Sequence, residues 1–236
     1  MASRRAADEL IASGAVRVNG EKSPREGMMV DPDADRVELN GRMVRPPVAH
    51  RYVMLNKPAG AITTAKDEAG RVTVLDIAGA EALRGHRLFP VGRLDGDSTG
   101  LLLLTDDGEL AHRLTHPRYK VAKEYVAVIA GIPAEADLER LRRGVKLDDG
   151  MTAPATVDVL KTDRGARDSG QAQLRVVIRE GRHRQVRRML LAVGHKVVAL
   201  RRTAFGPLRL GRLKAGGWRV LTHAELAALR HAAGLG

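Results

Sequence analysis

The chain has 236 residues, of which 44% are hydrophobic and 29% are charged, and this composition is typical of a globular protein. It contains no cysteine, which excludes disulfide bonds, thiolate metal sites and cysteine nucleophiles. The formal net charge is +12, so a negatively charged partner is expected. No apolar run approaches the roughly 18 residues that a membrane span needs, and the N-terminus lacks the apolar core of a signal peptide; we therefore expect a cytoplasmic protein with no membrane partner.

Residues 1–44 are predicted to form a small α/β module. A helix is expected over residues 4–13, because Ala7, Leu10 and Ile11 share one helical face. Short strands are expected at residues 16–18 and 36–39, since each is followed by an Asn-Gly pair, which is typical of tight hairpin turns. Residues 45–50 contain two consecutive prolines and are predicted to link this module to a larger domain, residues 51–236.

The larger domain is predicted to be α+β. Its expected strands are residues 52–56, 101–104, 125–130, 173–178 and 196–200, and its expected helices are residues 109–114, 134–143, 183–193 and a last one from residue 222. The four leucines at residues 101–104 indicate a strand that is buried on both faces. Asp106 or Asp107 is expected to cap the helix that follows this strand.

Positive charge is concentrated towards the C-terminal end. Residues 179–219 hold twelve Lys or Arg residues and a single acid, Glu180. Such a segment is typical of a surface that binds the phosphates of a nucleic acid, and the alternative is a basic surface that only promotes solubility. Aromatic residues make up 3% of the chain, so recognition through a platform of stacked rings is not expected.

The most informative segment is residues 92–105, which read GRLDGDSTGLLLLT. Asp95 lies in a glycine-bounded loop directly before the predicted buried strand, so its carboxylate is held on a rigid scaffold. From spacing alone this carboxylate can be a turn former, a metal ligand or a nucleophile, and a turn former is the commonest of the three. Asp95 and Asp97 do not suit a glycosidase pair, because two residues of one loop are poorly placed to flank a bond.

Four segments of the chain, in the same order, resemble the pseudouridine synthases of the RsuA/RluB type. Residues 92–105 are similar to the GRLDxxTxGLLLLTxDG signature of that family, with Ser98 where the family usually has Thr. The other three are NKPAG at residues 56–60, HP at 116–117 followed by KEY at 123–125, and EGRHRQVRRM at 180–189. The resemblance covers residues 52–207 and is nearest to the RluB branch. It implies the pseudouridine synthase fold, a mixed and mostly antiparallel sheet flanked by helices.

Residues 3–20 resemble the latter part of an S4-type RNA-binding module, which often precedes this catalytic domain. Such modules usually begin with a further helix, whereas here almost nothing precedes Ser3. Residues 1–44 are therefore expected to be a shortened, S4-like RNA-binding module.

The resemblance implies three catalytic residues. Asp95 is the carboxylate that would attack the target nucleotide, and this attack requires the ionised form. Tyr125 matches the tyrosine that packs on the base; without the Lys-Glu pair before it, an ordinary strand aromatic would be the simpler interpretation. Arg187 matches the basic residue that pairs with the carboxylate, because a guanidinium beside a partly buried carboxylate keeps it charged and oriented.

Five further basic residues are expected to bind substrate, namely Arg93, Lys57, Arg182, Arg184 and Arg188. On a helix Arg184, Arg187 and Arg188 would share one face, so part of this group is expected to contact phosphate or solvent instead of Asp95. Lys57 is expected to shape the wall of the site. No metal and no cofactor are expected, because the isomerisation that the resemblance implies is redox-neutral and hydrolyses nothing.

The resemblance and the basic segment together predict an enzyme that isomerises a specific uridine of ribosomal RNA, with large-subunit RNA favoured, after that nucleotide leaves its stack. The expected partner is ribosomal RNA or an assembling ribosomal subunit, and a monomer is expected. Two alternatives stay open. One is a non-catalytic RNA-binding factor of ribosome assembly on the same fold, and the other is a pseudouridine synthase that acts on small-subunit ribosomal RNA or on transfer RNA.

Overall fold

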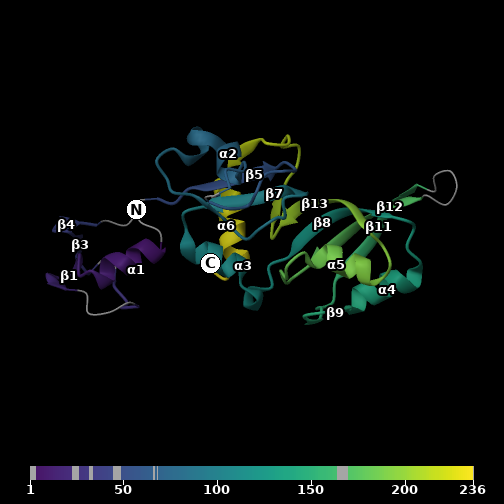
Figure 1. The fold of residues 1–236 in the computed structure, drawn as a ribbon, viewed down its shortest axis with the longest axis horizontal. Helices are drawn as coiled ribbons and strands as arrows, with labels where there is room; N and C mark the ends of the chain where they lie inside the picture. Colours follow the sequence, from purple (N-terminus) through teal and green to yellow (C-terminus); the bar gives the residue numbers. More distant parts are fainter. Residues whose placement is uncertain are drawn as a thin grey trace. The chain divides into compact units, whose positions relative to one another are not determined.

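The computed structural model describes residues 4–22, 27–31, 34–44, 49–65, 67, 69–163 and 170–235. The chain divides into two compact units, Met1–His50 and Arg51–Gly236, and each has its own sheet. Most of the expected linker, residues 45–48, lies outside the described residues. Figure 1 shows both units as ribbons, and they are described here one at a time.

The smaller unit combines one helix with a four-stranded sheet of order β2-β1-β3-β4. Its elements are α1 (Arg4–Ala12), β1 (Val16–Val18), β2 (Glu21–Lys22), β3 (Val37–Leu39) and β4 (Arg42–Met43). Both Asn-Gly pairs form the predicted hairpin turns. Their φ values are positive, as such turns require: 53° and 88° at Asn19 and Gly20, and 49° and 76° at Asn40 and Gly41. The likeness of this unit to an S4 module stays a prediction.

The larger unit is built on a nine-stranded sheet of order β11-β12-β8-β13-β7-β5-β15, in which β14 pairs with β13 and β6 with β7. Its strands are β5 (Tyr52–Lys57), β6 (Phe89–Pro90), β7 (Ser98–Thr105), β8 (Lys123–Ala130), β11 (Thr156–Asp163), β12 (Gln171–Ile178), β13 (Val197–Phe205), β14 (Leu208–Arg209) and β15 (Trp218–Val220). β13 and β7 run parallel, whereas the other neighbouring strands described are antiparallel. The predicted mixed, mostly antiparallel sheet is confirmed.

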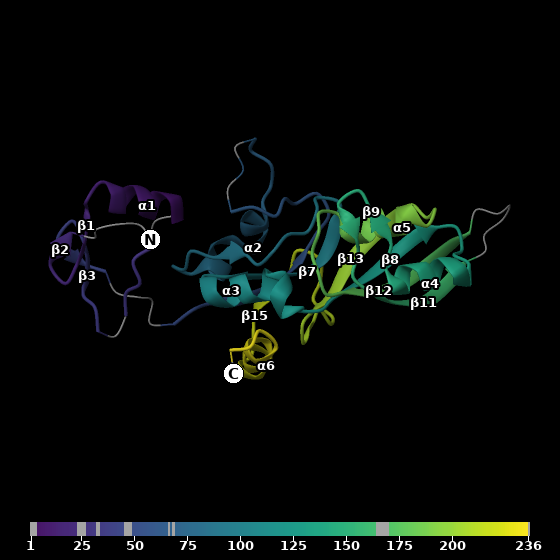
Figure 2. The ribbon, with the colours of Figure 1, turned by 90° about the horizontal axis from the view of Figure 1, so that it is seen from below.

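The helices cover the two halves of this sheet differently (Figures 1 and 2). They are α2 (Val74–Leu83), α3 (Gly108–Thr115), α4 (Glu135–Arg143), α5 (Gln185–Ala192) and α6 (His223–Ala232), with a 3-10 turn, η1 (Pro117–Tyr119). Around β5 and β7, α2 packs on one face and α3 and α6 pack on the other. The four leucines of β7 therefore alternate between two cores and all are buried, as predicted.

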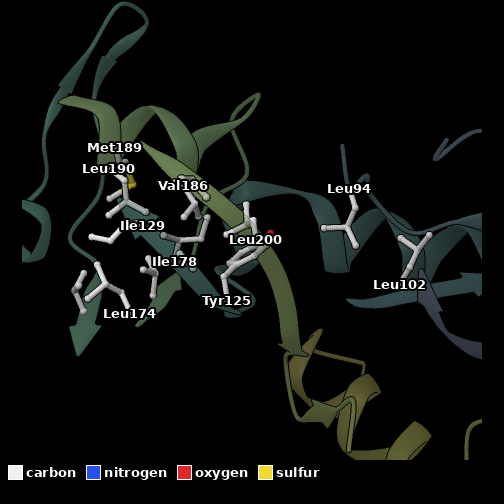
Figure 3. Close-up of a cluster of buried hydrophobic side chains, with 14 of the residues drawn as sticks. Leu94, Leu102, Tyr125, Ile129, Leu174, Ile178, Val186, Met189, Leu190 and Leu200 are labelled. Atoms are coloured by element: carbon white, nitrogen blue, oxygen red, sulfur yellow. The ribbon is translucent and has the colours of Figure 1, made fainter. Parts of the chain in front are cut away.

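The other half of the sheet has its buried face against α4 and α5. Figure 3 shows this cluster, in which α5 contributes Val186, Met189 and Leu190. Along β12 buried residues alternate with more exposed ones, which is the pattern of a strand with one face packed. Tyr125 and Leu200 belong to the same cluster and lie beside each other, between the side chains around α5 and Leu94 and Leu102 (Figure 3).

Helix caps follow the predicted signals. Asp107, rather than Asp106, caps α3 by accepting a hydrogen bond from the Leu110 amide at 2.9 Å. Thr222 caps α6 in a capping box with Glu225. No pattern in the sequence predicted α2, β11, β15 or the separate hairpin of β9 (Lys146–Leu147) and β10 (Gly150–Met151). α2 lacks a polar face and contains Gly79 at φ 74°, so its sequence shows no helical periodicity.

Candidate active site

The Asp95 loop joins β6 to β7 and is held at both sides of the carboxylate. On one side Leu94 is buried in the core, and the Thr63 hydroxyl donates to its carbonyl at 2.6 Å and accepts from its amide at 3.3 Å. On the other side the amide of Ser98 donates to the Asp95 carbonyl at 3.0 Å. The backbone of Asp95 is therefore fixed before any substrate arrives, which is what a reacting group requires.

Lys57 supports the Asp95 loop through hydrogen bonds to its backbone carbonyls. Its side chain is fully buried, and its ammonium donates to the carbonyls of Ser98 at 2.8 Å, Pro58 at 3.1 Å and Gly96 at 3.3 Å. Burial lowers the pKa of Lys57, and the charges of Asp97 and Asp95 act against this shift. The prediction that Lys57 binds substrate is corrected, because its three donor contacts point at loop carbonyls and leave no exposed surface for RNA.

Arg184 is the guanidinium that lies beside Asp95. Its Nη1 is 3.5 Å from Asp95 Oδ2, and its Nη2 is 3.3 Å from Asp97 Oδ2. Arg184 immediately precedes α5 and has a left-handed backbone conformation, with φ 47°. The Asp95 side chain is 27% exposed, so the pair remains open to a ligand.

Arg187 does not make the expected pair with Asp95. Its Nη2 lies 3.2 Å from Asp97 Oδ2, 3.3 Å from the Asp97 carbonyl and 3.4 Å from Ser98 Oγ. The expected pairing is corrected because Arg187 is one turn into α5, where it reaches the residues that follow Asp95. Partial burial acts to raise the pKa of Asp97, but the hydrogen bond from Arg184 and the charges of Arg187 and Arg184 outweigh it and lower the pKa.

Arg182 and Arg188 hold the β9–β10 hairpin. Arg188 bonds to Asp148 and, at 2.8 Å, to Asp149, while Arg182 bonds to Asp149 at 3.2 Å and to the carbonyl of Gly150 at 3.1 Å. These ion pairs occupy donors that were expected to bind substrate. Arg188 is not among the residues lining the cavity described below, and its role in binding substrate stays a prediction, whereas Arg182 lines that cavity with most of its donors in use.

A cavity of about 530 Å³ lies above the sheet at this point. It is lined by Val91, Gly92, Arg93, Leu94, Asp95, Ser98, Thr115, Lys123, Tyr125, Ile178, Gly181, Arg182, His183, Arg184, Gln185, Val186, Leu200, Arg202 and Phe205. Its volume falls in the range of roughly 300–1,000 Å³ that is usual for small-molecule sites. Asp95, Tyr125 and Arg93 all line it, so the structure brings these predicted residues together.

The floor of the cavity is a patch of the sheet itself. Tyr125 lies on β8 opposite Arg202 of β13, and Lys123 lies opposite Phe205. Tyr125 is 8% exposed and presents its ring beside the apolar Leu200 and Ile178 (Figure 3). A flat aromatic next to apolar side chains is a suitable surface for a nucleobase.

Three residues of this site were not predicted from the sequence, namely Thr63, Lys123 and Arg202. Thr63 and Arg202 lie outside the motifs that carried the prediction, and Lys123 was read only as part of the context of Tyr125. A signal existed for Lys123 and Tyr125, because residues two apart on a strand face the same side. No local signal could place Arg202 next to them, since the contact comes from pairing between distant strands.

The described part of the chain contains no cluster of metal-ligating side chains. There, no group of three or more His, Cys, Asp or Glu side chains could hold a metal ion. His112 and His116 are four residues apart with ring centroids at 5.2 Å, but they have no third partner of this kind among the described residues.

Within the described part of the chain, no helix is long and apolar enough to cross a membrane.

The known proteins that this chain resembles are pseudouridine synthases. The sequence model of the family "RNA pseudouridylate synthase" matches residues 51–192. The chain is 42% identical, over its full length, to an RNA pseudouridine synthase of Aquifex aeolicus, of which it covers 91%. Over 98% of its length it is 44% identical to the ribosomal large subunit pseudouridine synthase B of Bacillus subtilis, of which it covers 91%. A pseudouridylate synthase crystal structure matches with a TM-score of 0.69 and 32% identity, over 96% of this chain and 94% of that chain.

Proposed function

The chain belongs to the RNA pseudouridylate synthase family, and we propose that it converts a uridine of large-subunit ribosomal RNA to pseudouridine, with Asp95 as the attacking carboxylate. The observation that carries this proposal is the position of Asp95, in a cavity that also holds Tyr125 and beside the guanidinium of Arg184. The choice of ribosomal RNA rests on the similarity to the Bacillus subtilis enzyme and agrees with the net charge of +12.

The reaction conserves all atoms of the nucleotide. The bond between ribose C1′ and uracil N1 breaks, the base turns, and a bond from C1′ to C5 forms; C5 loses its hydrogen as a proton and N1 gains one. Asp95 can begin this by adding to C6, by attacking C1′ or by assisting formation of a glycal. Each route needs the ionised carboxylate in contact with the nucleotide, which must first leave its stack.

The neighbours of Asp95 suit each of these routes. Arg184 places positive charge 3.5 Å from the carboxylate and limits its rotation. Tyr125 offers its ring to the extruded base, and Arg93, which is exposed at the rim, is placed to contact RNA outside the cavity. We propose that the chain acts as a monomer in the cytoplasm, on ribosomal RNA that is free or part of an assembling subunit.

Release of tritium from ribosomal RNA that carries [5-³H]uridine tests this proposal, because the C5 hydrogen leaves in every route. Wild-type protein should release tritium, and Asp95→Asn should lower the rate by about 10³-fold or more. Glu81→Gln, at an exposed position of α2, serves as the matched carboxylate control and should leave the rate unchanged. If wild-type protein bound ribosomal RNA but released no tritium from it, this result would instead support a non-catalytic binding factor.

A further inference from the structure

Two cations stand side by side on the floor of the cavity. Lys123 of β8 and Arg202 of β13 both line it, and both lie over the ring of Phe205, with the Lys123 Nζ 5.8 Å and the Arg202 Cζ 5.1 Å from the ring centroid. Their strands are neighbours in the sheet. The positive charges are therefore held close together by the main fold rather than by a mobile loop.

Neither cation has a carboxylate at ion-pair distance within the described residues. Arg202 is 2% exposed; its Nε donates to the Leu101 carbonyl at 2.7 Å, but its Nη2 is buried without a hydrogen-bond partner in that part of the chain. The Lys123 ammonium donates to the Val121 carbonyl at 3.3 Å. Glu180 is the acid whose charge raises the pKa of Lys123, and its carboxylate is already bonded to Arg182 and the Ala153 amide.

This arrangement costs free energy in the empty protein. Burial and, to a lesser extent, the charge of Arg202 together lower the pKa of Lys123 to about 8, against the weaker opposing effect of Glu180. Buried charges without partners are destabilising, and an orphaned guanidinium nitrogen adds to that cost. A bound anion would satisfy both groups at once.

We infer that Lys123 and Arg202 form a phosphate subsite, which takes a backbone phosphate next to the target uridine while the base packs against Tyr125. This inference rests on the proposed function for the identity of the nucleotide. A phosphate suits the pair better than the uracil carbonyls do, because a carbonyl is uncharged and would neutralise neither cation. The apolar part of the floor, with Tyr125, Leu200 and Ile178, remains available to the base.

Nucleotide titration followed by NMR tests this subsite with the intact chain. The probes are 5′-UMP, 3′-UMP and uridine, which differ only in the phosphate, together with inorganic phosphate alone. Wild-type protein should bind at least one UMP isomer roughly tenfold more tightly than uridine. Lys123→Met, which keeps the length of the side chain without its charge, should lose this difference and leave uridine affinity unchanged. Lys123→Arg should retain most of it.

Lys161→Met provides the control, because Lys161 is exposed on β11 and does not line the cavity. It should behave as wild type. An equal loss of UMP and uridine affinity in Lys123→Met would show that the lysine contacts the base and would overturn the inference. The inference would also be overturned if the phosphate did not increase the affinity of wild-type protein, whether UMP and uridine bound equally or neither bound.

Tritium release by the same preparations separates this inference from the proposed function. Active wild-type protein whose nucleotide binding does not depend on phosphate would overturn the subsite alone. Inactive wild-type protein with phosphate-dependent binding that needs Lys123 would support the subsite and contradict the proposed function. In the active enzyme, Lys123→Met should raise KM for RNA more than it lowers kcat.

Discussion

Two groups of basic residues lie in or next to the cavity, and they differ in what neutralises their charge. Around α5, Arg184 and Arg187 are paired with Asp97, and Arg182 and Arg188 are paired with Asp148 and Asp149. On the sheet floor, Lys123 and Arg202 have no described carboxylate partner at ion-pair distance. The arginine-rich segment is prominent in the sequence, yet much of its charge is used within the protein. No pattern in the sequence singled out Lys123 or Arg202 as a ligand-binding residue, and Lys123 appeared only as part of the KEY element.

The largest effect is expected from Gly100→Ala, which would disturb the strand pairing that places Arg202. A Cβ at Gly100 would lie 2.2 Å from the Arg202 carbonyl oxygen, and the φ of 106° is unfavourable for any L side chain. We expect a loss of about 3 kcal/mol or more in the free energy of unfolding, measured by urea denaturation. Gly96→Ala is the control, because nothing lies within 4 Å of the added Cβ and its φ is not positive. Equal stability of the two variants would contradict this account of Gly100.

Arg184→Met should reduce activity next most strongly. It removes the guanidinium beside Asp95, so we expect kcat to fall by roughly 10- to 100-fold. Its side chain is 39% exposed, and little change in unfolding free energy is expected. The matched variant is Arg187→Met. If Arg187→Met lowered kcat far more than Arg184→Met at equal stability, the pairing of Arg184 with Asp95 would not be the functional one.

Lys123→Met should stabilise the protein without RNA, by roughly 1–2 kcal/mol at pH 7 once partial solvent screening is allowed for. The folded-state pKa of Lys123 is about 8, below its ordinary 10.5, so the unfolded chain binds more protons between these values. Wild-type stability therefore gains relative to the variant as the pH rises from 8 to 10.5. Thermal unfolding of both proteins at several pH values measures this. An advantage of Lys123→Met that stayed constant up to pH 10.5 would contradict the assignment.

The smallest effect is expected from Asp149→Asn, in the group where cations are already paired. Asp149 is an exposed partner of Arg182 and Arg188, and such pairs contribute little. We expect kcat/KM to change by about twofold at most. A large gain in RNA affinity would show that this hairpin restrains arginines that otherwise bind phosphate. The comparison between the two basic groups would then need revision.

Local patterns predicted much of the fold correctly. The Asn-Gly turns, the buried leucine strand and the helix caps at Asp107 and Thr222 all follow from preferences that act over a few residues. The family resemblance is confirmed by the match over residues 51–192. α2 was missed because it lacks a polar face and contains Gly79. β15 was missed because, unlike the equally short β1 and β3, it is not followed by an Asn-Gly pair.

The sequence by itself determined the family, the general fold and the position of Asp95 in a rigid loop before a buried strand, because those features depend on contiguous motifs. Only the tertiary structure decided which cation meets which anion. Arg184, which precedes α5, lies beside Asp95, whereas Arg187, within α5, pairs with Asp97, and these contacts depend on how α5 packs against the Asp95 loop. Lys123 and Arg202 become neighbours because β8 and β13 pair across the sheet, and no pattern along a single strand encodes the register between two.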